Sequence, residues 1–124
     1  MLQDNYLGRQ IDMLARMLSM LLLKLDVSTY FDTADGAHAL RGDAAAFFAE
    51  LEALVAANDI GAAEDAVFDR LGDDVPPHVI QAALVFYLRL NGLRDKALED
   101  GGFSKEEILD GLNEMREIFG IEAI

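Results

Sequence analysis

The chain contains no cysteine, and only two of its 124 residues are proline. The absence of cysteine excludes disulfides, thiolate metal sites and cysteine nucleophiles, and it favours a cytoplasmic location. Proline interrupts helices, so its scarcity leaves room for long ones. Because the hydrophobic residues, 52% of the chain, recur with helical rather than alternating spacing, the sequence predicts an all-α protein.

Basic residues are also scarce. The chain has 10 Lys and Arg against 23 Asp and Glu, which gives a net charge of −13. Residues 1–25 hold two acids and three bases, so the excess of acid lies downstream. Such a surface repels phosphate groups, and we therefore expect neither nucleic acid nor anionic membranes as partners. A long hydrophobic run is missing too, since only seven residues separate Arg16 from Lys24, too few for a membrane span or a signal peptide.

Residues 1–25 are predicted to form a long N-terminal helix on which the other helices pack. One apolar stripe, predicted to face the core, consists of Leu7, Ile11, Leu14, Leu18, Leu21 and Leu25. A second stripe lies about 100° round the helix, and it consists of Tyr6, Met13, Met17 and Met20. Gly8 and Ser19 fall in the remaining polar arc. The second stripe has two interpretations, namely further core packing or a surface that binds a second protomer or a partner protein.

The remaining chain divides into an irregular connection at 26–42, two helical hairpins at 43–100 and a C-terminal capping helix at 101–124, all within one domain spanning 1–124. Val27, Tyr30 and Phe31 are expected to pin the connection to the core, and a turn of helix is possible at 37–40. The caps supporting these boundaries are Asp43 and Asp59 as N-caps, Gly72 as a terminator, Ser104 with Glu107 as a capping box, and Gly120 as a stop.

A shift of 34 residues aligns Leu51 with Val85 and Leu54 with Leu88. This is the tetratricopeptide period, so the hairpins resemble a degenerate tetratricopeptide-like array in which the second unit is cut short by two glycines, Gly101 and Gly102. A second pattern spans the segments 4–15, 87–93, 102–108 and 118–121. Through these segments nearly the whole chain resembles a small uncharacterised bacterial helical family of unknown function. This resemblance implies a compact helical protein and supplies no catalytic residues.

In a tetratricopeptide-like array the first helix of each pair lines a concave groove. Here the groove would present Phe48, Val55, Phe86 and Arg89. We expect the N-terminal helix to fill this groove as an internal ligand. The alternative is that a small molecule or peptide binds there.

Residues with catalytic or metal-binding potential are isolated in the sequence. His38 and His78 have no second ligand at metal-binding spacing, and Asp32, Asp35 and Gly36 lack the pattern of a calcium loop. We therefore predict no enzyme activity, no metal and no cofactor. The sequence favours a non-catalytic protein-interaction or assembly module that homodimerises through its N-terminal helix, with a groove-binding sensor as the alternative.

Overall fold

The computed structural model describes residues 2–32, 37–38 and 40–121, and the elements in these ranges are mostly helical. The helices are α1 (Leu2–Leu23), α2 (Gly42–Ala56), α3 (Ile60–Arg70), α4 (Pro77–Asn91), α5 (Asp95–Asp100) and α6 (Lys105–Ile118). Between α1 and α2 lie the 3-10 helix η1 (Val27–Thr29) and a two-residue antiparallel ladder formed by β1 (Phe31–Asp32) and β2 (Ala37–His38). The predicted all-α class is confirmed.

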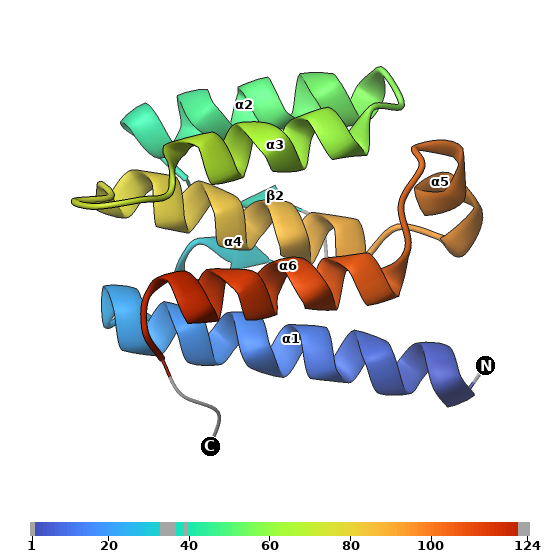
Figure 1. The fold of residues 1–124 in the computed structure, drawn as a ribbon, viewed down its shortest axis with the longest axis horizontal. Helices are drawn as coiled ribbons and strands as arrows, with labels where there is room; N and C mark the ends of the chain where they lie inside the picture. Colours follow the sequence, from blue (N-terminus) through green and yellow to red (C-terminus); the bar gives the residue numbers. More distant parts are fainter. Residues whose placement is uncertain (1, 33–36, 39, 122–124) are drawn as a thin grey trace.

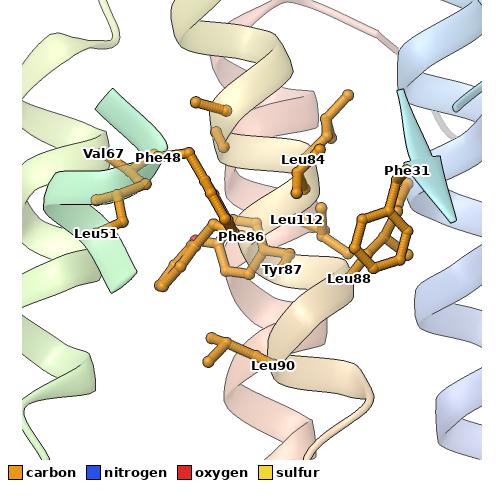
Figure 2. Close-up of a cluster of buried hydrophobic side chains, with 14 of the residues drawn as sticks. Phe31, Phe48, Leu51, Val67, Leu84, Phe86, Tyr87, Leu88, Leu90 and Leu112 are labelled. Atoms are coloured by element: carbon orange, nitrogen blue, oxygen red, sulfur yellow. The ribbon is translucent and has the colours of Figure 1, made fainter. Parts of the chain in front are cut away.

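Helix α4 lies in the middle of the molecule, between the α2–α3 pair on one side and α1 with α6 on the other (Figure 1). Ten of its 15 residues are buried. Figure 2 shows Phe48 of α2 on one side of α4 and Phe31 of β1 on the other. A helix that buries side chains around its circumference needs neighbours on several sides. The organising element is therefore α4 rather than the N-terminal helix.

Helix α1 packs against α4 and α6 through Ile11, Ala15 and Leu18, each with 0% of its surface exposed. Leu21, which was predicted to face the core, is 44% exposed. The buried face is turned from the predicted stripe by roughly 60°, counting 100° per residue. Asn91 at the end of α4 contacts this face of α1, and its side-chain amide donates to the Gly8 carbonyl at 3.0 Å.

Ser19 was placed in the polar arc by sequence, but it is completely buried. Its hydroxyl lies 2.6 Å from the Tyr30 hydroxyl and donates to the Leu25 carbonyl at 2.5 Å. A buried polar group is tolerated when its hydrogen bonds are made, as they are here. Burial also raises the pKa of Tyr30, against the opposing effect of the Ser19 hydrogen bond.

The connection after α1 is held to the core by the three residues predicted to do so, since Val27, Tyr30 and Phe31 are 1%, 4% and 5% exposed. The turn of helix predicted at 37–40 is wrong, because Ala37 and His38 pair with β1 in an extended conformation. Each strand has only two residues, which is too short for the alternation of apolar and polar side chains that predicts a strand.

Several predicted helix ends are confirmed. Asp59 accepts a hydrogen bond from the Ala62 amide at 3.1 Å, and the Ser104 hydroxyl accepts one from the Glu107 amide at 3.2 Å. Gly120 has φ of +70° and closes α6 with a Schellman motif, in which the Ile121 amide donates to the Arg116 carbonyl at 3.0 Å.

Two predicted helix ends are wrong. Asp43 lies in the first turn of α2 rather than at its N-cap, where its charge still complements the positive end of the helix dipole. Gly72 is not in the left-handed region, and α3 ends at Arg70 with Leu71 in an extended conformation. Asp74, with φ of +57°, makes the left-handed turn before α4 instead.

Of the two predicted hairpins, only α2–α3 forms a complete antiparallel pair (Figure 1). Helix α5 has only six residues and lies at one end of the molecule, with few contacts to α4. The Gly101–Gly102 pair ends it, and α6 then runs beside α4 and α1. The helix after α4 is therefore short and ends at the two glycines, whereas the tetratricopeptide-like arrangement of the hairpins stays a prediction.

Candidate interaction surface

Large hydrophobic side chains are exposed in one part of the molecule. Among residues whose side chains the structure describes, those exposed are Tyr6, Met13, Met20, Leu21, Leu25 and Ile118. All but Ile118 belong to α1 or to the turn directly after it. Ile118 ends α6, and the C-terminal ends of α1 and α6 lie together because the two helices run side by side in the same direction (Figure 1). A clustered set of this kind marks an interaction surface more often than scattered single residues do.

The second stripe of α1 forms the outer face of this helix. Tyr6, Met13 and Met20 are 58%, 69% and 52% exposed, whereas Met17 is half-buried. Further core packing, the first interpretation of the stripe, is therefore wrong for three of its four residues. Gln10 lies between Tyr6 and Met13, and its amide donates to the Tyr6 hydroxyl at 3.2 Å.

We define the α1 seam as Tyr6, Gln10, Met13, Met17 and Met20. Their spacing alternates between four and three residues, which is the pattern of a coiled-coil seam. Every seam residue is uncharged.

An open hollow of about 490 Å³ adjoins the α1 seam, between α1 and α6. It is lined by Gln10, Met13, Leu14, Met17, Leu109, Asn113 and Arg116. Arg116 is the one charged residue of this lining, and its Nε donates to the Asn113 side chain at 3.2 Å. The seam and hollow together present apolar and neutral polar groups with adaptable methionine side chains, a composition that suits contact with another protein.

A second open hollow, of about 460 Å³, lies on the other flank of α1. Its lining comes from α1, from Phe31, and from the end of α4 with the residues just after it, and consists of Gly8, Arg9, Asp12, Arg16, Phe31, Leu88, Arg89, Asn91, Gly92 and Leu93. Arg16 Nε lies 2.8 Å from an Asp12 carboxylate oxygen, and this hydrogen bond raises the pKa of Arg16. This basic hollow is chemically unlike the hollow beside the seam.

Glu64 of α3 and Tyr87 of α4 form a polar pair inside the helical layers. The Tyr87 hydroxyl donates to the Glu64 carboxylate at 2.6 Å. Burial raises the pKa of both groups, and the Tyr87 hydrogen bond partly offsets this for Glu64. Gly111 of α6 leaves space for the pair, because a Cβ atom at that position would collide with the Tyr87 hydroxyl and the Glu64 carboxylate. Neither Glu64 nor Tyr87 lines either hollow.

The four predicted groove residues differ in how far they are buried, and they do not line one groove. Phe48 and Phe86 are 3% and 1% exposed and belong to the core (Figure 2). Val55 is half-buried against that core. Arg89 reaches the basic hollow, and its Nη2 lies 2.9 Å from a Glu52 carboxylate oxygen. The expectation that α1 fills a groove between α2 and α4 is wrong, since α1 packs on α4 and α6.

The other residues with catalytic or metal-binding potential lie apart. His78 is half-buried in the first turn of α4, whereas Asp35, Gly36 and the side chains of Asp32 and His38 fall outside what the structure describes. Within the described ranges, no three His, Asp or Glu residues come together in a way that could hold a metal ion. The same ranges contain no helix long and apolar enough to cross a membrane.

The basic hollow was not anticipated from the sequence, because Arg89 is more than seventy residues away in the chain from Arg9 and Arg16. The one local signal was the richness of residues 1–25 in bases relative to the acidic remainder.

Neither a curated protein nor a solved structure matches the chain. Residues 1–120, however, match a family model described as "Family of unknown function (DUF6483)". The chain therefore belongs to this family of unknown function.

Proposed function

We propose that the protein is a non-catalytic assembly module that forms a homodimer through the α1 seam. The observation that carries the proposal is the exposure of Tyr6, Met13 and Met20 in one line along α1. Exposed apolar surface gains free energy when a partner covers it, at roughly 25 cal/mol per Å². The alternative, a ligand in an apolar groove at Phe48 and Phe86, has lost its support because both side chains are buried.

A second copy of the chain suits this surface for an electrostatic reason. Two copies carrying a net charge of −13 each repel one another over most approaches. The seam is uncharged, and the adjoining hollow carries a single positive charge at Arg116. Contact through this face therefore keeps the acidic bodies apart while it buries apolar surface.

The seam is also arranged symmetrically. Tyr6 and Met20 lie seven residues on either side of Met13, the most exposed of the three. A two-fold axis passing near Met13 would place each Tyr6 opposite the Met20 of the other copy, in an antiparallel pair of α1 helices. Two-fold dimers use the same patch on both subunits, so a self-complementary seam meets that requirement.

The charge variant Met13→Glu tests the proposal. A glutamate there would bring two like charges together in a desolvated contact, so we expect the wild type to sediment as a dimer and the variant as a monomer. Met13 is 69% exposed, so its replacement leaves the fold of the subunit intact, unlike replacement of half-buried Met17. Ala53→Glu is the matched control, because Ala53 lies exposed on α2, away from the seam.

A crosslinking experiment tests the antiparallel arrangement of the two α1 helices in the proposed dimer. The chain has no cysteine, so Met13→Cys creates a single thiol. With a two-fold axis near position 13, mild oxidation should join two copies through a disulfide, whereas Ala53→Cys should not crosslink under the same conditions. A monomeric wild type, or a dimer that Met13→Glu leaves unchanged, contradicts the proposal.

A further inference from the structure

The basic hollow concentrates positive charge in an acidic protein. Three of the chain's 10 basic residues, Arg9, Arg16 and Arg89, line it, and Asp12 is its one acidic lining residue. The lining itself therefore has a formal charge of +2. Asp26 and Glu52 pair with Arg16 and Arg89 from outside the lining, so the hollow with its ion-pair partners is neutral, whereas the whole chain has a net charge of −13. Because the surrounding field is negative, an anion would be favoured at this hollow over the rest of the surface.

Ion pairs hold two of the three guanidinium groups, those of Arg16 and Arg89, in place. Arg16 Nη1 lies 3.6 Å from Asp26, in addition to its contact with Asp12. Arg89 is held by Glu52 on α2 at 2.9 Å. A guanidinium has five N–H donors, so these contacts orient each group and leave other donors for a ligand. Arg9 is exposed and makes no ion pair or hydrogen bond within the part of the chain that the structure describes.

The hollow also has an apolar part. Leu93 is half-buried and supplies most of this part, while Phe31 and Leu88 are core residues, 5% and 4% exposed, that reach the hollow only with their edges. The backbone amides at Gly92 and Leu93 are used by the end of α4, where they donate to carbonyls of Leu88, Arg89 and Leu90. The groups available to bind a ligand are therefore guanidinium donors and a small apolar area.

We propose that this hollow binds a small organic anion, with a phosphate or carboxylate group at the arginines and a small apolar body beside Leu93 and the exposed edges of Phe31 and Leu88. A volume of about 460 Å³ suits a ligand of this size. Planar guanidinium groups pair with either anionic group through two parallel hydrogen bonds. This site is separate from the α1 seam, so it does not depend on dimerisation.

Titrations followed by amide chemical shifts test the proposal, with phenyl phosphate and phenylacetate as anionic probes. We expect saturable shifts at Gly92 and Leu93 with at least one of the two, and the probe that binds identifies the preferred anionic group. Inorganic phosphate lacks the apolar body of the ligand, and benzyl alcohol lacks its anionic group. Both should bind at least about fivefold more weakly, because each forfeits either the apolar contact or the charge-assisted hydrogen bonds.

Arg9→Gln is the main variant, because Arg9 holds no other part of the described structure. Loss of one charge-assisted contact should raise the dissociation constant of the probe about tenfold. Arg41→Gln removes the same charge from an exposed position at the start of α2 and should leave binding unchanged. Thermal melting of both variants should match the wild type.

Three outcomes overturn the proposal. They are the absence of saturable shifts with both anionic probes, equal binding of benzyl alcohol or inorganic phosphate, and an equal loss in Arg9→Gln and Arg41→Gln. The monomeric Met13→Glu variant should bind the probe as the wild type does, so failure of this site and failure of the dimer are distinguishable.

Discussion

Helices α4 and α1 are both rich in large apolar residues, but they use them differently. Helix α4 buries ten residues and has none of the exposed large hydrophobic side chains. Helix α1 is longer, with 22 residues, and exposes Tyr6, Met13, Met20 and Leu21. The difference lies in their neighbours, since α4 is covered from several sides and α1 lies at an outer edge of the molecule (Figure 1). Apolar composition alone therefore does not separate a central helix from one with a face left for a partner.

The comparison between α4 and α1 is tested most strongly by a pair of alanine substitutions. Phe86→Ala empties space at the centre of α4 and should lower the free energy of unfolding by about 3–5 kcal/mol. Met13→Ala removes an exposed side chain and should change it by less than about 0.5 kcal/mol. Urea unfolding measures both, at a protein concentration low enough to keep dimerisation out of the comparison. Equal losses would show that the outer face of α1 is packed within its own subunit.

Ser19→Ala tests how much the hydrogen bonds on the buried side of α1 contribute to stability. Removal of this hydroxyl leaves the Tyr30 hydroxyl and the Leu25 carbonyl short of a partner, which should cost about 1–3 kcal/mol of unfolding free energy. Ser28→Ala makes the same chemical change at an exposed position and should cost less than about 0.5 kcal/mol. If the two variants unfold alike, the end of α1 is open to water.

The smallest expected effect is on the pH dependence of stability, and it comes from the Glu64–Tyr87 pair that joins α3 to α4. Burial raises the pKa of Glu64 in the folded protein, so the folded state keeps a proton that the unfolded chain has already lost. The stability contributed by protonated Glu64 is therefore present at low pH and is lost as the pH rises from the ordinary glutamate pKa through the raised one.

Glu64→Gln removes this titration and keeps an oxygen that accepts from Tyr87. Relative to the wild type, the variant should gain stability as the pH rises from the ordinary glutamate pKa through the raised pKa of Glu64, and then level off. Urea unfolding at a series of pH values measures the difference. Glu99→Gln, on the exposed surface of α5, controls for the change in net charge. A difference independent of pH, or one that moves in favour of the wild type, would contradict this account.

Helix boundaries were largely predictable because their chemistry is local. Asp59, Ser104 and Gly120 act on amides and carbonyls within a few residues of themselves, so the signal lies in short stretches of sequence. Gly72 shows the limit of this reasoning, since Asp74 makes the left-handed turn in its place. A glycine permits that conformation without requiring it.

The candidate sites were predictable only in part. Four of the five residues of the α1 seam, all but Gln10, were recognised as a second apolar stripe because helical periodicity is visible in sequence. Its exposure was not, since burial depends on which helices lie alongside. The basic hollow was missed entirely, because Arg9 and Arg89 are eighty residues apart in the chain and meet only where α1 crosses α4.

By itself, the sequence determined the all-α class, most helix ends, the truncation of the second hairpin at Gly101–Gly102 and the acidic surface, because these follow from local backbone preferences and from composition. Only the tertiary structure decided that α4 is the central helix, that Ser19 is buried, and which side of α1 remains open. Those outcomes depend on which elements pack beside α1 and α4, and on hydrogen bonds between separate elements, such as those of Ser19 with Tyr30 and of Asn91 with Gly8. Short-range patterns in a chain carry no record of such long-range contacts.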